Sequence, residues 1–251
     1  AGRRARHAGD GSAGPGPGAA DAVLVAAAVC PQPPLIVPEV ASGAAPELDD
    51  LRTACDEAVR RLTAADLELL VVVGGDRRTR DYGGDAAGSL RSYGLDLTIG
   101  AGEPVLPLSL TIGRWLLSRG NDPGRTRFQG VAADAPTEEC LRLGRRLAGA
   151  ADRVGLLAMG DGTACRTQKA PGYLDERAEP YDLTVAKALG DADTATLTRL
   201  DPRTSDELRV AGRAAWQVLA GAAGAGRFTA DLLATEAPYG IGYVVASWRA
   251  C

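Results

Sequence analysis

Histidine is almost absent from this chain of 251 residues: the one histidine, His7, lies in a stretch rich in glycine, proline, alanine and arginine. A serine hydrolase with a Ser-His-Asp triad needs an imidazole to activate its serine. Ser109 and Ser205 stand near expected helix starts, but no histidine accompanies either of them beyond the N-terminal stretch. A hydrolase of this type is therefore excluded.

Other features are scarce as well, and each absence narrows the class of protein. The five cysteines form no CxxC pair and their number is odd, which favours a reduced, cytoplasmic protein over a disulfide framework. The longest apolar run, residues 22–30, is too short to cross a bilayer, and the prolines after it make a poor signal-peptide cleavage site. The net charge of −4 does not indicate a protein that binds nucleic acid or an anionic membrane.

The chain alternates between expected strands and helices from residue 22 onward. Apolar, β-rich runs predict strands over 23–29, 67–73, 127–132, 153–159, 228–234 and 241–248. Helical spacing predicts helices over 46–62, 104–118, 137–148, 180–189 and 204–222, with Pro46 in a first turn and a long loop over 75–102. We expect one α/β domain over 22–251, with a mostly parallel central sheet flanked by helices. Residues 1–21 are expected to be a disordered tail.

Four segments with glycine or proline follow the expected strands. They are Cys30-Pro31-Gln32-Pro33-Pro34, Gly74-Gly75-Asp76, Gly160-Asp161-Gly162-Thr163-Ala164-Cys165 and Glu236-Ala237-Pro238-Tyr239-Gly240. In sheets of this kind, sites form at the carboxyl ends of the strands. The sequence therefore predicts that these segments share one pocket.

These segments, in this order, resemble class III extradiol ring-cleavage dioxygenases of the B-subunit type and their Memo-like relatives. Pro31-Gln32-Pro33-Pro34 resembles the family's Pro-His-Pro-Pro, and 70–76 resembles the strand that ends in Ser-Pro-His. Residues 160–173 resemble Asp-x-x-His-Arg followed by Ala-Pro-x-Gly-Tyr, and 236–244 resemble Glu-Gly-Pro-Phe-Gly-Val-Gly-Tyr. The resemblance spans about residues 23–248.

The resemblance implies a non-haem Fe(II) site in which two histidines and one glutamate hold the metal and a further histidine moves protons. Here the two histidine ligand positions hold Gln32 and Asp76, the acid/base position holds Ala164, and Glu236 matches the carboxylate ligand. A glutamine amide is a weak, neutral ligand, and an alanine cannot transfer a proton. The resemblance therefore implies a pseudoenzyme that has lost its iron site and has no catalytic residue we can name.

Two readings of the function stay open. In the first, the protein needs no cofactor and binds a small molecule or a protein partner in an ancestral pocket formed by Gln32, Asp76, Asp161, Ala164, Cys165, Tyr173, Glu236 and Tyr239. In the second, it is an enzyme with altered chemistry. That enzyme would use Cys30 and Cys165, or a divalent metal (Fe, Mn, Mg or Zn) held by Asp76, Asp161 and Glu236.

Simpler structural roles compete with both readings. Asp76 could pair with Arg77, Arg78 or Arg166, and Glu236 with backbone N–H groups. The cysteines could be small core residues. Family relatives often form dimers or larger assemblies, so a homo-oligomer is a reasonable expectation.

Overall fold

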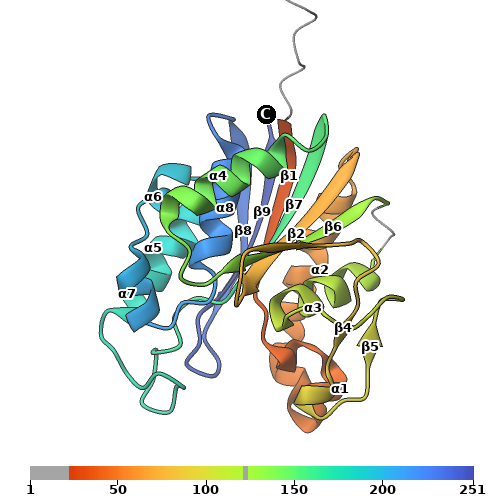
Figure 1. Ribbon diagram of the computed structural model, residues 1–251. Helices are drawn as coiled ribbons and strands as arrows, with labels where there is room; N and C mark the ends of the chain where they lie inside the picture. Colours follow the sequence, from red (N-terminus) through yellow and green to blue (C-terminus); the bar gives the residue numbers. More distant parts are fainter. Residues whose placement is uncertain (1–22, 121–123) are drawn as a thin grey trace, which may run out of the picture.

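The computed structural model describes residues 23–120 and 124–251, so the expected tail over 1–21 lies outside the described residues. The chain forms an α/β fold in which helices cover both faces of one seven-stranded sheet (Figure 1). The strand order is β3-β6-β2-β7-β1-β9-β8. The strands are β1 (Val23–Cys30), β2 (Leu69–Asp76), β3 (Arg80–Tyr82), β6 (Thr126–Ala132), β7 (Arg153–Met159), β8 (Phe228–Glu236) and β9 (Tyr243–Ala250).

The centre of the sheet is parallel and its edges are antiparallel. β6, β2, β7 and β1 run parallel to one another, whereas β3 is antiparallel to β6, and β9 is antiparallel to both β1 and β8. The predicted α/β class and mostly parallel sheet are confirmed. The parallel strands read as unbroken apolar runs because both of their faces are buried.

The two faces of the sheet carry separate hydrophobic clusters. One face packs against α4 (Thr137–Ala148), α5 (Ala178–Gly190), α6 (Thr194–Thr198) and α8 (Arg213–Ala223). The other packs against α2 (Asp49–Thr63) and α3 (Leu108–Ser118). Successive residues of β1 alternate between the faces: Ala27 and Val29 join the first cluster, and Ala28 and Cys30 join the second. This alternation follows from the two-residue period of a strand.

Most predicted elements are present, but three predictions are wrong in detail. Pro46 lies in a 3-10 turn, η2 (Ser42–Leu48), which is preceded by η1 (Pro34–Ile36) and α1 (Pro38–Ala41). The expected loop over 75–102 contains β3, η3 (Arg91–Tyr93), and a small hairpin of β4 (Gly88–Ser89) and β5 (Thr98–Ile99). The expected helix over 204–222 is two helices, α7 (Pro202–Glu207) and α8, because the chain turns at Arg209, whose φ of 55° is left-handed.

None of the helices in the described part of the chain is both long enough and apolar enough to cross a membrane.

Candidate functional site at the strand ends

Three of the four predicted segments meet at one end of the sheet, where the parallel strands finish. β1, β2, β7 and β8 all end there, because β9 is antiparallel to both β1 and β8. The backbone N–H of Gln32 donates a hydrogen bond of 2.7 Å to the carboxylate of Asp161. The loop after β7 also pairs with the β8–β9 turn, since Gly162 N donates to Gly242 O at 2.7 Å. We call Gln32, Asp161, Glu236, Tyr239 and Tyr243 the strand-end site.

The side chain of Gln32 is unsatisfied. Its amide oxygen Oε1 is buried and accepts no hydrogen bond from any described residue. A buried oxygen without a donor costs about 1–3 kcal/mol relative to a paired one, so such atoms are rare in folded proteins. The orphaned oxygen therefore marks a position where a bound molecule with an O–H or N–H group would be stabilised.

Asp161 is a carboxylate in a poorly solvated environment. Burial raises its pKa to about 7, and the one hydrogen bond from the Gln32 backbone only partly opposes this effect. The hydroxyl of Tyr243 also has a raised pKa, first because it is buried and then because Asp161 and Tyr239 add negative charge nearby. Near neutral pH, Asp161 can therefore either donate or accept a proton within this site.

Glu236 closes β8 and pairs across the hairpin with Tyr243. The carboxylate of Glu236 makes no hydrogen bond or ion pair with the described residues, so the expectation that backbone N–H groups satisfy it is wrong. Burial, and then the charge of Asp50, raise the pKa of Glu236. Tyr239 follows on the same turn, and its hydroxyl donates a hydrogen bond of 3.0 Å to Glu47. The strand-end site thus holds two carboxyl groups that lack cationic partners.

Asp76 has a different environment. Its carboxylate accepts hydrogen bonds from the Tyr82 hydroxyl at 2.6 Å, from Arg80 Nε at 3.1 Å and from the backbone N–H of Arg77 at 2.6 Å. Burial by itself would raise the pKa of Asp76, but these hydrogen bonds together outweigh it and hold the pKa below its ordinary value. Asp76 does pair with an arginine, but the partner is Arg80 and not Arg77, Arg78 or Arg166 as expected; Arg166 pairs with Glu179 and Asp182 instead. A metal ion at Asp76 would have to displace these partners.

No cluster that could hold a metal ion through three or more histidine, cysteine, aspartate or glutamate side chains occurs within residues 23–120 and 124–251. An Fe(II) site of the kind that the resemblance implies would need two imidazole nitrogens and a carboxylate. The residues at those positions are a neutral amide, Gln32, and a carboxylate already bound to Tyr82 and Arg80, Asp76. This donor set does not suit Fe(II).

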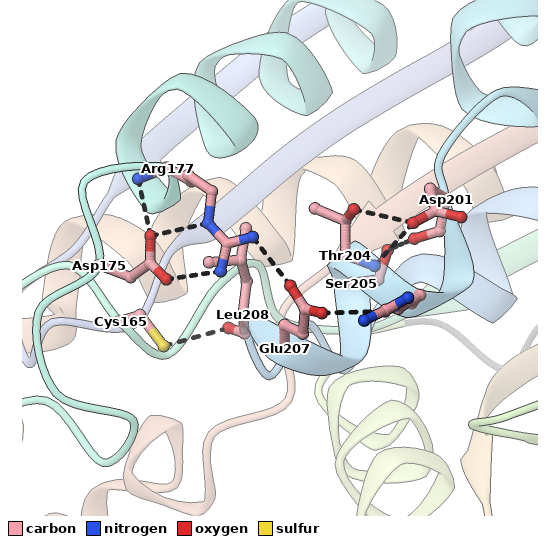
Figure 2. A network of polar contacts seen from close by, with 9 residues as sticks. Cys165, Asp175, Arg177, Asp201, Thr204, Ser205, Glu207 and Leu208 are labelled. Atoms are coloured by element: carbon pink, nitrogen blue, oxygen red, sulfur yellow. Dashed lines mark hydrogen bonds and ion pairs between the residues drawn. The ribbon is translucent and has the colours of Figure 1, made fainter.

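The loop that carries Ala164, Cys165 and Tyr173 is fastened to α7 (Figure 2). The backbone N–H of Ala164 and the thiol of Cys165 both donate to the carbonyl of Leu208, at 3.0 and 3.5 Å. Tyr173 is 73% exposed, with a left-handed φ of 61°. Ala164 and Cys165 are therefore buried parts of the loop, whereas Tyr173 lies open to solvent.

A network of ion pairs holds the far side of the same loop. Arg177 donates to Asp175 at 2.8 Å and to Glu207 of α7 at 2.8 Å (Figure 2). Asp201 caps α7 by accepting a 2.8 Å hydrogen bond from the backbone N–H of Thr204. These contacts fix the position of the loop without using any residue of the strand-end site.

Cys30 and Cys165 pack in separate hydrophobic clusters, which gives no support to a reactive pair of these two thiols. Cys30 packs in the cluster under α2, and Cys165 packs with Ala178 and Leu208. The neighbour of Cys30 is Cys55 of α2, whose pKa is raised by burial and then by a hydrogen bond with Cys30. Four of the cysteines are buried and Cys251 is exposed.

Asp182 of α5 is a residue that the sequence analysis missed. It is 4% exposed and accepts two hydrogen bonds of 2.8 Å, from the backbone N–H and the hydroxyl of Thr163. A side chain at Gly162 or Gly242 would collide with its carboxylate oxygens, at 2.5 and 2.3 Å. The only sequence signal for this role is an aspartate on an otherwise apolar helix face. Asp182 thus anchors the loop that carries Asp161.

No protein-family model matches the chain, and no curated protein matches its sequence. Among solved structures, the chain is similar to an uncharacterized protein, JW3007, from Escherichia coli K12. The two share 12% sequence identity and superpose with a TM-score of 0.55, over 90% of this chain and 99% of the other. A likeness at this identity shows a shared fold and says nothing about activity.

Proposed function

We propose that the strand-end site binds a small polar molecule, and that the protein is a catalytically degenerate relative of the class III extradiol dioxygenases, B-subunit type. The buried, unpaired Oε1 of Gln32 carries the proposal. A ligand hydroxyl that donates to this oxygen would satisfy it. Glu236, the last residue of β8, and Tyr239, on the turn after it, would bind other polar groups of the ligand.

The side chains at the ligand positions support loss of ring cleavage. Gln32 offers no imidazole, Asp76 is already bonded to Tyr82 and Arg80, and Ala164 has no proton to transfer. A protein can keep its ligand-binding pocket after it has lost catalytic activity, because the hydrogen bonds and the shape of the pocket do not depend on the metal. The proposal therefore assigns recognition, and no reaction, to the strand-end site.

A second candidate is an enzyme that transfers a proton at Asp161. The observation that favours it is the pKa of about 7, which is suited to general acid/base work near neutral pH. In this reading Asp161 would exchange a proton with a ligand held by Gln32 and Glu236. A substrate that is turned over, rather than only bound, distinguishes the two candidates.

The test is a binding titration with catechol and 3,4-dihydroxybenzoate, in which calorimetry and ligand-observed NMR detect the binding. Each compound presents hydroxyl donors that suit Gln32 Oε1. We expect binding to the wild type, and a loss of about tenfold or more in Gln32→Leu, since a buried polar contact is removed. Gln168→Leu, at an exposed position on the loop after β7, is the matched control and should leave the affinity unchanged.

Three outcomes would overturn the proposal. If neither compound binds, or if Gln32→Leu binds as tightly as the wild type, the strand-end site does not recognise such ligands through Gln32. If protein loaded anaerobically with Fe(II), and then exposed to oxygen, yields a ring-cleaved product from either catechol, the protein is an active dioxygenase and is not degenerate.

A further inference from the structure

A cavity lies at the opposite end of the sheet from the strand-end site. Its volume is about 940 Å³, and it is bounded by the last turn of α2, the start of β1 and strands β8 and β9. In Figure 1 this end of the sheet is at the top, where β1 begins and the C-terminus is marked. The volume is within the range of small-molecule sites.

The lining of this cavity is rich in arginine. It includes Arg60, Arg61, Arg153 and Arg249, against two acidic residues, Asp66 and Asp231. The acidic residues are already engaged: Arg61 donates to Asp231 at 2.7 Å, and Arg153 lies 3.4 Å from the carboxylate of Asp66. The cavity therefore presents more positive than negative charge to an incoming molecule.

Arg249 is a cavity-lining arginine that takes part in none of these ion pairs. It lies on β9, is exposed, and its guanidinium makes no hydrogen bond or ion pair with any residue that the structure describes. Arg60, by contrast, is held by Glu57 through two hydrogen bonds of 2.7 Å. A free guanidinium at the wall of a cavity is a ready partner for a carboxylate or phosphate, which it can bind through two parallel hydrogen bonds.

Ser247 provides an independent observation at the same place. It is two residues before Arg249 on β9, so both side chains are on the same face of the strand. Ser247 is only 7% exposed and lines the cavity, yet its hydroxyl makes no hydrogen bond with the described residues. The hydroxyl oxygen is not among the fully buried polar atoms that lack a partner, so it is accessible from the cavity that Ser247 lines and can bond to a ligand there.

We infer that this cavity is a binding site for a small organic oxyanion, whose carboxylate or phosphate group bonds to Arg249 and Ser247. Thr229 is the residue opposite Arg249 in the β8–β9 hairpin, and it lines the same cavity. Ala26, Ala64 and Ala65 line the cavity with apolar surface, against which the carbon skeleton packs. The site uses none of the residues of the strand-end site, so it is independent of the function proposed above.

The test is calorimetric titration of the full chain at low salt with citrate and with glycerol 3-phosphate. The anionic groups of citrate are all carboxylates, and that of glycerol 3-phosphate is a phosphate, so the pair identifies the preferred anion. We expect at least one of them to bind, with an affinity about tenfold lower in Arg249→Gln, since a charge-assisted pair is lost. Ser247→Ala should weaken binding several-fold, and both variants should keep the urea-unfolding midpoint of the wild type within error.

The control is Arg78→Gln, which removes an exposed arginine just after β2, at the other end of the sheet. It should leave binding unchanged. An equal loss in Arg78→Gln and Arg249→Gln would show a diffuse charge effect and overturn the site, as would the absence of binding by both anions. Wild-type affinity in Ser247→Ala and Arg249→Gln together would overturn it as well.

Discussion

Thr163 donates two hydrogen bonds to one carboxylate, that of Asp182, through its backbone N–H and its hydroxyl, each at 2.8 Å. The two residues are 19 positions apart, and the bonds connect the loop after β7 to α5. Arg166 adds a third bond to the same carboxylate at 3.2 Å. Since this loop carries Asp161, the buried contact holds one side of the strand-end site in place.

Replacing Asp182 with alanine should therefore destabilise the fold. The change leaves the N–H and hydroxyl of Thr163 buried without an acceptor, and removes the partner of Arg166. We expect the free energy of unfolding to fall by about 3 kcal/mol, as measured by urea denaturation. Asp191→Ala is the control, because Asp191 is exposed and its ion pair with Lys187 should contribute less than about 0.5 kcal/mol. Equal effects of the two changes would contradict the anchoring role of Asp182.

The stability of the protein should depend on the ionisation of Asp161. Its pKa is about 7 in the fold, against an ordinary value of 3.8, so the folded state retains a proton that the unfolded chain releases. The stabilising contribution of the protonated form is therefore complete below about pH 4, declines as pH rises, and is lost above about pH 7.

Comparing the wild type with Asp161→Asn isolates this contribution, because the asparagine cannot ionise and still accepts the Gln32 hydrogen bond. From pH 5 to pH 8, the wild type should lose stability relative to the variant, by a few kcal/mol at most. Urea denaturation at both pH values measures the difference. A difference that stays constant with pH would show that Asp161 ionises normally.

The hydrogen bond from Tyr82 to Asp76 should be measurable as well. Tyr82 is buried, and the effects of burial and of Asp76 raise its pKa to about 12, so the hydroxyl remains a donor at any physiological pH. We expect Tyr82→Phe to lower the free energy of unfolding by about 1.5 kcal/mol, as thermal denaturation would show. Tyr93→Phe, at a 41% exposed position, should change it by less than about 0.5 kcal/mol.

The cysteines should differ sharply in reactivity. Cys251 is exposed, whereas the other four are buried, and burial raises the pKa of the Cys55, Cys140 and Cys165 thiols. Iodoacetamide should therefore modify the native protein rapidly at Cys251 alone, as located by peptide mass spectrometry. Cys251→Ser should abolish this fast phase. Fast labelling of Cys30 or Cys165 would instead revive a reactive-cysteine function.

The central sheet could be predicted from the sequence because its strands carry their own signal. The expected range over 153–159 coincides with β7, and that over 137–148 with α4, since the apolar periodicity of each is uninterrupted. The break between α7 and α8 could not be predicted in this way. There the helical pattern continues through Arg209 and Gly212, and the backbone turns because both residues pack against the loop after β7, where Gly212 donates to the Asp161 carbonyl.

For the candidate site too, some features could be predicted from the sequence and others could not. The sequence by itself determined the α/β class, the four segments at the strand ends, and the absence of histidine at positions where the family that these segments resemble carries it. These features depend on residue identity and local periodicity. Only the tertiary structure decided that Asp76 bonds to Tyr82 and Arg80 while Gln32 Oε1 is left without a donor. Such outcomes depend on which side chains the packing brings within about 3 Å of one another, and no local pattern encodes that distance.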